Sequence, residues 1–552
     1  MSSPTFGQPK IFSSPMGHRK YLALLGALTV PFALASCGGD ADGDDQGAET
    51  DQDDSANGED DASNGEPVSG GEVTQVISVD TSTWDPARLP NMNPTLSASP
   101  FSAVYGQLLY SNVESGEVEP GLAESMTPNE DGTVWELTLR DGVEFSDGTA
   151  FDAEAVKTNW DRLADPETSA VSAPAAQSFE SEVIDELTLE LTTEEPDFFL
   201  DRVVASQLTF IVSPTAMDEN PDVFTDDPVG AGPFVLSEAV SGSHYVYTPN
   251  ENYWDEGKPY LDQLTIQVIG DRQQQRDTVS SQNTDLFIAN AMGAEEWIAG
   301  TDMQLPSFDV GGSRSMFFNT ARAPFDDPRA REAIALALDL EDIAYANEPE
   351  EGSTSPDSLF AEDSPFYDVD FALPSQDPDE AQRLFDELAE EGSPVEFSIV
   401  AGGAGGTRSA ELIQSELGAY ENVTVNLDII PLPNFEEQVA FRGEFDLAIR
   451  PGSMFVNSPS PGIDQLLRTG GVNNISNYSS DEMDELLDAV RAESEVEDQR
   501  DALSEVFDLY LEELPWLPFG NTELVVTHIP ELEGIELFEE GTARYQELYR
   551  TD

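Results

Sequence analysis

The sequence contains few of the residues on which many catalytic and metal sites depend. Of 552 residues only one is cysteine, Cys37, and three are histidine: His18, His244 and His528. A single cysteine excludes a disulfide framework within the chain and also excludes metal sites built from several cysteines. Because His18 lies in a leader-like segment and the other two histidines are far apart in sequence, catalysis or metal binding by several histidines is poorly supported.

Basic residues are also scarce. The sequence has 24 lysines and arginines against 109 aspartates and glutamates, which gives a formal net charge of −85. Such a field repels nucleic acid and anionic membrane surfaces, so no nucleic-acid partner is expected. We interpret the charge as the solvated acidic surface of a salt-adapted protein. Attraction of a cationic ligand is the alternative, but high salt would screen it to a few ångströms.

The first 36 residues have the pattern of an export signal. An apolar run, YLALLGALTVPFALA (21–35), follows the basic flank His18-Arg19-Lys20. The run is shorter than the about 20 residues of a membrane span but suits a signal-peptide core. It ends in Leu34-Ala35-Ser36-Cys37, which resembles a bacterial lipobox. We therefore predict a lipoprotein signal peptide over 1–36 and lipidation of Cys37; a buried free thiol is the alternative.

Residues 37–71 are predicted to form a disordered acidic tether. The segment after Cys37 has no aromatic and almost no aliphatic residue, so it cannot bury enough surface to offset the entropy of ordering. Its like charges would extend it. A calcium-binding tract is the alternative, which the lack of regular ligand spacing disfavours.

Five carboxylates crowd into LTLRDGVEFSDGTAFDAEAV (137–156): Asp141, Glu144, Asp147, Asp152 and Glu154. An EF-hand loop would need ligands where Val143 and Phe145 stand, and nothing makes the carboxylates converge as a catalytic pair would. Asp-Gly pairs at 141–142 and 147–148 instead predict turns, and Asp152 is placed to cap a helix. From residue 153, apolar residues recur on one helix face, so the stretch is interpreted as scaffold.

The string WELTLRDGVEFSDGTAFDAEAVKTNWDRL (135–163) resembles the signature of the family 5 extracellular solute-binding proteins, the peptide- and nickel-binding components of ABC importers. Further segments resemble this family in the same order along 72–552. They are PVGAGPFVLSEAV (228–240), NENYWDEGKPYLDQLTIQVI (250–269), DLFIAN (285–290), FFNTARAPFDDPRAREAIALALD (317–339), FDLAI (445–449), NISNYSSDEMDELLDAV (474–490) and ELPWLPF (513–519).

The resemblance implies a two-lobe α/β fold of the periplasmic-binding-protein type, with a hinge between the lobes. The first lobe would span 72–310, with an extra subdomain near 115–215, and the second lobe would span 311–517. Residues 518–552 would return to the first lobe. Such proteins close their lobes around a solute.

The residues support this organisation independently. Asp327-Pro328 provides an N-cap and a proline at the first helical position. Strands at 395–400 and 423–430, with a helix near 408–417 between them, form a βαβ unit. The glycine-rich AGGAGGTR (401–408) is interpreted as a permissive strand-to-helix turn. It is not a dinucleotide loop, because Arg408 occupies the last position of the G-x-G-x-x-G pattern.

The family's cleft loop corresponds here to RPGSMFVNSPSPGID (450–464). Peptide-binding relatives commonly place there a Trp and an Asp that takes the peptide's amino group, but this chain has neither at the matching positions. Arg450 is the main candidate ligand-binding residue, because its fixed charge follows a strand end and suits a carboxylate; a structural ion pair is the alternative. Three further candidates on this loop are Met454, Phe455 and Asn457.

A first-lobe loop, WDPARLPNMNPT (84–95), corresponds to the loop whose backbone meets the ligand in the family. By that resemblance Leu89 to Met92 face the solute, including Asn91 and Met92. An ordinary proline-rich loop is the alternative.

The sequence therefore predicts a lipid-anchored substrate-binding protein at the outer face of the cytoplasmic membrane or in the periplasm. It would be a monomer without a cofactor or resident metal, and it would deliver a short peptide to the permease and ATPase of an ABC importer. A secreted hydrolase is the rival class, but no G-x-S-x-G motif is present. A nickel-chelate receptor stays open within the family, although 450–464 has no histidine, and so does a sensor or adhesion lipoprotein.

Overall fold

The computed structural model describes residues 67–551 apart from short gaps at 82, 90–93, 114–116, 221, 291–293, 350–353, 357, 361–363, 368–370, 432–433, 436, 452–457 and 539–540. The signal peptide, Cys37 and nearly all of the acidic tether lie outside the described residues. Among the helices that are described, none is long and apolar enough to cross a membrane.

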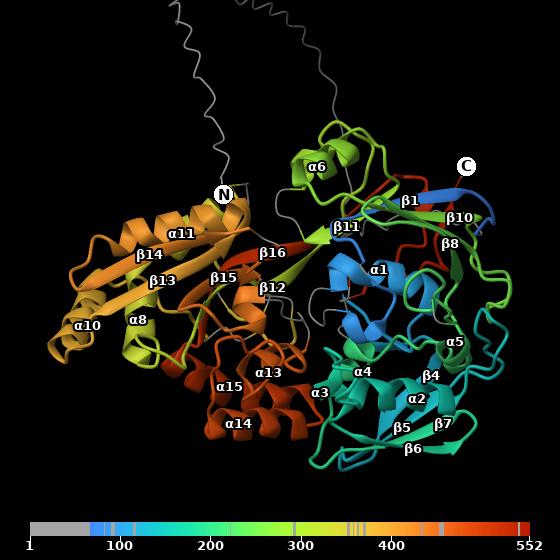
Figure 1. Ribbon diagram of the computed structural model, residues 1–552, viewed down its shortest axis with the longest axis horizontal. Coiled ribbons are helices and arrows are strands. Elements are labelled where there is room, and N and C mark those ends of the chain that lie inside the picture. The colour runs from blue at the N-terminus through green and yellow to red at the C-terminus, as the bar shows by residue number, and fades with distance from the viewer. Residues whose placement is uncertain are drawn as a thin grey trace, which may run out of the picture. The chain divides into compact units, whose positions relative to one another are not determined.

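A ten-stranded mixed sheet runs through the fold (Figure 1). Its strands, in sheet order, are β14 (Val423–Ile430), β13 (Val395–Gly402), β15 (Leu447–Pro451), β12 (Ser307–Phe318), β16 (Trp516–His528), β11 (Leu286–Asn290), β1 (Glu72–Ile77), β10 (Gln263–Val268), β9 (His244–Pro249) and β8 (Phe234–Val240). Two short pairs stand apart from it: β2 (Leu109–Ser111) with β3 (Val118–Pro120), and β17 (Leu532–Glu533) with β18 (Tyr549–Arg550).

Strands β12 and β16 connect two hydrophobic cores, and we call them the crossing strands. They pair antiparallel, and the register of their pairing shifts next to Arg314. At the start of β16, Trp516 and Leu517 belong to one core, whereas Leu524 and Val526 further along belong to another. We call these the second-lobe core and the first-lobe core. Two strands that leave one core and enter the other give the hinged two-lobe architecture that the sequence predicted, although the exact lobe boundaries stay a prediction.

A separate four-stranded sheet, with order β4-β5-β7-β6, forms the subdomain of the first lobe. Its strands are β4 (Ala123–Pro128), β5 (Val134–Leu139), β7 (Thr188–Thr192) and β6 (Glu180–Asp185). Helix α2 (Ala153–Ala164) packs on this sheet and buries Val156, Trp160 and Leu163, the apolar face predicted from the sequence. The alternating segment WELTL (135–139), which precedes the predicted turns, forms most of β5.

The remaining helices flank the two sheets. In chain order they are η1 (Pro86–Arg88), α1 (Pro94–Tyr105), α3 (Ala173–Ala176), α4 (Leu200–Gln207), α5 (Pro214–Glu219), α6 (Arg272–Ser280), α7 (Glu295–Ile298), α8 (Pro328–Ala337), α9 (Leu340–Asn347), α10 (Pro378–Glu390), α11 (Gly403–Leu417), η2 (Glu437–Phe441), α13 (Gly462–Leu467), α14 (Asp481–Ala492) and α15 (Val496–Glu513). As expected, Asp327 caps α8 and Pro328 is its first residue.

The βαβ unit of the second lobe is confirmed, but its glycine-rich segment was interpreted wrongly. Strands β13 and β14 pair in parallel, and α11 lies along them (Figure 1). Helix α11 starts at Gly403 rather than near Arg408, so most of AGGAGGTR is helix and not a turn. Gly405 is required by packing, because a Cβ there would lie 2.8 Å from the backbone oxygen of Asn347 at the end of α9. The family-like segment FDLAI (445–449) overlaps β15, which begins at Leu447.

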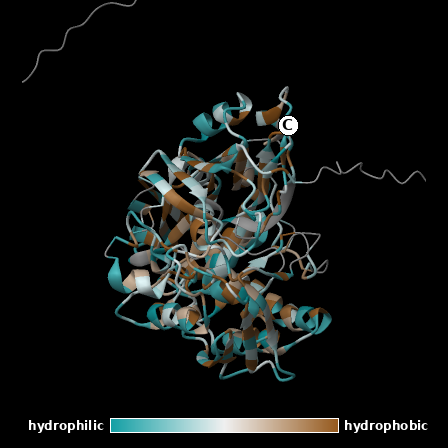
Figure 2. Cartoon of the chain, turned by 90° about the vertical axis from the view of Figure 1, so that its right-hand side faces the viewer, coloured by the Kyte–Doolittle hydropathy of each residue, from teal (hydrophilic) through white to brown (hydrophobic). Residues whose placement is uncertain are grey.

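Hydropathy follows these layers. Figure 2 shows hydrophobic residues, in brown, concentrated on strands and the inner sides of helices, with hydrophilic teal prominent on peripheral helices and turns. Besides the cores of the two lobes, the subdomain has its own core, which includes Trp135, Phe145 and Trp160. This separation of cores follows from chain length, because single cores stop growing beyond about 250–300 residues.

Candidate ligand-binding site

Two carboxylates of the acidic stretch at 137–156, Asp147 and Asp152, have the turn and cap roles predicted for them. The Asp147 carboxylate accepts hydrogen bonds from the Thr149 backbone N–H at 2.9 Å and from the Ser213 hydroxyl at 2.7 Å. Burial alone would raise the pKa of Asp147, but the bonds from Thr149 and Ser213 outweigh burial and hold it below its usual value. Asp152 caps α2 through the Ala155 backbone N–H at 2.8 Å. Each of these carboxylates has a local structural partner.

Arg450 lies near the end of β15, next to the crossing strands. It pairs directly with Ser315 on β12, one residue from the register shift at Arg314. The Arg450 side chain is partly exposed, although its Nε is buried. The structure thus places a fixed positive charge beside the strands that join the lobes. Its role in ligand binding stays a prediction.

The other five predicted ligand-binding residues lie outside the described residues. They are Asn91, Met92, Met454, Phe455 and Asn457. The chain is described again from Ser458, and there Asp464 is held by Arg468, whose Nη2 lies 2.7 Å from an Asp464 oxygen. Asp464 thus already has a charged partner at the end of its own helix.

The first-lobe loop is described up to Leu89. It contains the short helix η1, which Asp85 caps through the backbone N–H of Ala87 at 3.0 Å. Arg162 from α2 makes two hydrogen bonds to the Asp85 carboxylate, at 2.9 and 2.7 Å. The subdomain thereby fixes the start of the loop, and Leu89 packs against the first-lobe core.

A cavity of about 270 Å³ lies between α3 and α4 of the subdomain and the 460–472 segment of the second lobe. Pro174, Ala175 and Val203 line one side, and Pro461 and Val472 line the other. The second-lobe side begins within the predicted cleft loop, since Ser460, Pro461 and Asp464 belong to both. A space whose walls come from both lobes is where a two-lobe protein would enclose a solute.

The charged residues around this cavity are already paired. Arg468 binds Asp464 and also Asp488, at 2.8 Å, while Arg491 pairs with Asp197 from the subdomain. Neither Arg491 nor Asp197 was predicted from the sequence as a functional residue. Only the scarcity of arginine could have drawn attention to Arg491, and no sequence signal identified its partner.

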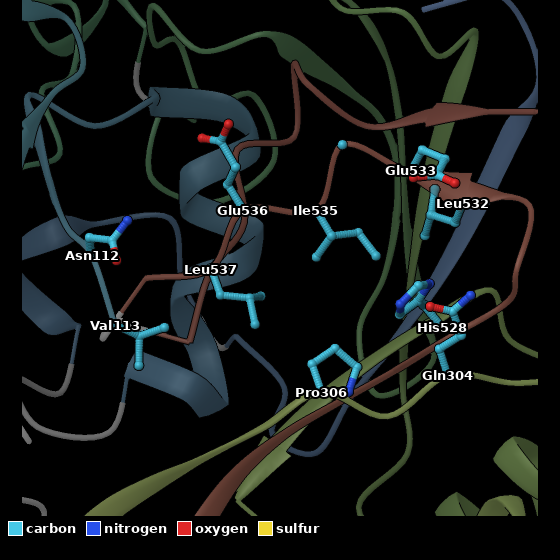
Figure 3. Close-up of a pocket in the computed structure, with 11 residues that line it drawn as sticks. Asn112, Val113, Gln304, Pro306, His528, Leu532, Glu533, Ile535, Glu536 and Leu537 are labelled. Atoms are coloured by element: carbon cyan, nitrogen blue, oxygen red, sulfur yellow. The ribbon is translucent and has the colours of Figure 1, made fainter. Parts of the chain in front are cut away.

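A second cavity, of about 440 Å³, lies within the first lobe (Figure 3). It is lined by Asn112, Gln304 and His528 and by the chain around Glu536. Burial lowers the pKa of His528, which therefore stays neutral at about pH 7. The other polar side chains that line the cavity are Asn112, Gln304, Glu533 and Glu536.

Within the described residues, no group of three or more histidine, cysteine, aspartate or glutamate side chains could hold a metal ion.

The family model described as bacterial extracellular solute-binding proteins, family 5, matches residues 117–474. This is more than half of the chain, and the two-lobe fold agrees with it. The chain belongs to this family of extracellular solute-binding proteins.

Among curated proteins, the glutathione-binding protein GsiB of Salmonella paratyphi A is similar to this chain. The two are 25% identical over 490 residues, which cover 84% of this chain and 91% of GsiB. The similarity extends over nearly the whole relative, so both lobes are included.

Two solved structures share the fold. The periplasmic binding protein AgaA of A. tumefaciens R10, in complex with agropinic acid, aligns with a TM-score of 0.76 and 24% identity over 87% of this chain and 99% of AgaA. DppA of Helicobacter pylori, in complex with the peptide STSA, aligns with a TM-score of 0.74 and 20% identity over 88% of this chain and 99% of DppA. The two-lobe binding-protein fold predicted from the sequence is thereby confirmed.

Proposed function

We propose that this chain is the substrate-binding lipoprotein of an ABC importer and that it captures a short peptide or similar zwitterion between its lobes. The observation that carries the proposal is the family match on a chain whose crossing strands join two separate cores. GsiB is named for glutathione, which is itself a peptide derivative, and DppA was solved with a peptide. These ligands support a peptide-like solute here.

Arg450 is proposed to bind the solute's carboxylate, since a guanidinium can form paired hydrogen bonds to it. Met454, Phe455 and Asn457 would line the same wall, and Asn91 and Met92 would contribute from the first lobe. The usual amine-binding Asp is absent from the cleft loop, so the amino group would be recognised by other acceptors.

Cys37 is proposed to carry the lipid anchor, with residues 37–71 as the acidic tether between the membrane and the folded lobes. The protein would then act at the outer face of the cytoplasmic membrane or in the periplasm, as a monomer that delivers solute to a permease and its ATPase. It would need no cofactor and would perform no chemical turnover.

Native mass spectrometry of the purified protein, before and after addition of a defined peptide mixture, tests the proposal. We expect one bound peptide per chain, recovered unchanged. Cleaved products would favour the hydrolase alternative. If a metal chelate or a sugar binds and peptides do not, the peptide assignment is wrong. As a control, the same mixture is incubated with protein unfolded in guanidinium and returned to buffer without refolding.

A further inference from the structure

The three residues Asp197–Phe199, which we call the bridging segment, connect the subdomain to the second lobe at a place remote in sequence from the crossing strands. The segment lies between β7 and α4, both elements of the subdomain. Each of its residues contacts the second lobe. The chain therefore has a second connection between its lobes besides β12 and β16.

Asp197 makes the charged part of this connection. Its side chain is 1% exposed, and its carboxylate accepts a hydrogen bond from the Arg491 guanidinium at the end of α14. Its other oxygen accepts the Phe199 backbone N–H at 2.9 Å. The Asp197 backbone is also fixed within the subdomain, since its carbonyl accepts the Trp135 indole N–H at 2.9 Å and its N–H donates to Gly132. The carboxylate is thus held rigidly toward Arg491.

Phe198 and Phe199 extend the contact. The Phe198 backbone N–H donates to the Arg491 carbonyl at 2.9 Å, so Arg491 is bound by both its side chain and its backbone. Phe199 is fully buried and belongs to the second-lobe core, although Leu200 beside it belongs to the subdomain core. Burial of a phenylalanine from one lobe in the core of the other favours the arrangement in which they touch.

Arg491 also lines the cavity between the lobes, and its Nε is buried without a hydrogen-bond partner among the described residues. One side chain therefore borders the proposed solute space and pairs across the lobes. Opening the lobes would separate Arg491 from Asp197 and expose Phe199.

We infer that Asp197 and Arg491 are positioning residues for solute capture: their ion pair, with Phe199, latches the subdomain to the second lobe and sets how long a solute stays enclosed. The inference rests on the proposed function. A ligand can shift the lobes only by its differential affinity for the two arrangements, so a contact made in one arrangement alone changes the apparent affinity.

The test uses Asp197→Asn, Arg491→Gln and the double variant. Asn at 197 can keep the bond to the Phe199 N–H while losing the charge. We expect each single variant to raise the dissociation rate of a bound peptide about tenfold. The double variant should be no worse than either single one, because both remove the same interaction. Arg491→Lys keeps the charge, so its dissociation rate should lie between those of the wild type and Arg491→Gln. If the effects of the two single variants on the dissociation rate added up in the double variant, or if no variant changed the rate, the inference would be overturned.

A matched control is Asp161→Asn, which breaks the ion pair with Lys157 on α2 of the same subdomain. That pair is exposed and lies within one helix, so the dissociation rate should not change.

A second readout needs no ligand, so it separates failure of the latch from failure of the proposed function. Spin labels are placed at Val240→Cys on β8 and Glu390→Cys on α10, both exposed positions, in a Cys37→Ser background. The distribution of distances between the two spin labels, measured by pulsed double electron–electron resonance, should broaden in Asp197→Asn and Arg491→Gln but not in Asp161→Asn. If peptides never bind yet the distributions broaden, the function is wrong and the latch stands. Unchanged distributions would refute the latch.

Discussion

At the scale of single residues, several of the chain's few arginines form ion pairs with partly or fully buried carboxylates. Arg162 binds Asp85, Arg468 binds Asp488 and Arg491 binds Asp197, so each of these three guanidiniums joins two separate elements. In a chain with 109 acidic residues, any buried carboxylate needs such a partner or must gain a proton. Two residues allow this balance to be tested.

Arg450 is expected to contribute binding energy through a charge-assisted hydrogen bond to the solute. Arg450→Ala should weaken peptide binding by about tenfold to a hundredfold, the effect of losing about 1.5–3 kcal/mol. Arg450→Lys should recover only part, because an ammonium lacks the paired geometry. Calorimetric titration measures the change. Arg383→Ala, on the exposed face of α10, should have no effect; equal losses in both variants would contradict a role for Arg450.

Asp201 is expected to destabilise the fold at neutral pH. Burial raises its pKa to about 6, with a smaller contribution from Asp197, although Arg202 partly offsets this. Between about pH 4 and about pH 6 the unfolded chain loses this proton while the folded chain keeps it, so stability falls as pH rises through that window. Asp201→Asn should therefore raise the free energy of unfolding at about pH 7 by about 1–2 kcal/mol.

Urea unfolding of wild type and Asp201→Asn at several pH values isolates this effect, because the other carboxylates cancel in the difference. The gain should be nearly absent at about pH 4 and complete above about pH 6. Exposed Asp161 provides the control, since Asp161→Asn should give no pH-dependent difference. A gain of equal size at every pH would argue against titration of Asp201.

At the scale of elements, the helices follow local sequence rules closely. Asp152, Asp271 and Asp327 each cap a helix through a carboxylate oxygen, and Pro328 occupies the first position of α8. These rules act within a few residues, so they could be applied from the sequence. Helix α11 is the exception, because five residues at its start include three glycines, which local propensity disfavours. At the start of α11, tertiary packing against α9 outweighs the poor helix propensity of glycine.

Two neighbouring glycines in α11 are expected to respond in opposite directions to the same change. Gly405→Ala would place a Cβ 2.8 Å from the Asn347 carbonyl oxygen, so it should lower stability by about 1–2 kcal/mol despite the better helix propensity of alanine. A Cβ on Gly406 meets only ordinary contacts, 3.7 Å from Ala401, so Gly406→Ala should raise stability by about 0.5–1 kcal/mol. Thermal unfolding of the two variants measures both stability changes. Changes of the same sign would contradict the packing argument.

At the scale of the whole molecule, the two main features are the net charge and the connectivity of the chain. The formal net charge of −85 makes the chain repel itself, which opposes any compact state. The connectivity is discontinuous, since β16 returns late in the chain to pair with β11. Among the described residues, the contacts between the lobes include the two crossing strands, the bridging segment and the ion pair between Arg272 and Glu348. Salt screens such repulsion, so the stability of the fold is expected to depend on ionic strength.

The melting temperature is expected to rise with salt. Between about 0.1 M and about 1 M NaCl the screening length falls from about 10 Å to about 3 Å, so most of the self-repulsion is removed in this range. Calorimetry in NaCl and in KCl should give closely similar rises that level off near the upper end. A melting temperature that does not change, or that falls, would contradict a stability limited by charge.

The sequence by itself determined the family, the mixed α/β class, the caps of its helices and the scaffold role of the 137–156 carboxylates, because turns, caps and amphipathic faces depend on neighbours in the chain. It could not assign the glycine-rich start of α11, whose packing partner Asn347 lies more than fifty residues earlier in the chain. Nor could it pair Asp197 with Arg491, which are 294 residues apart. Only tertiary structure decides such pairs, since long-range contacts are set by how the lobes pack and leave no periodic trace in the chain.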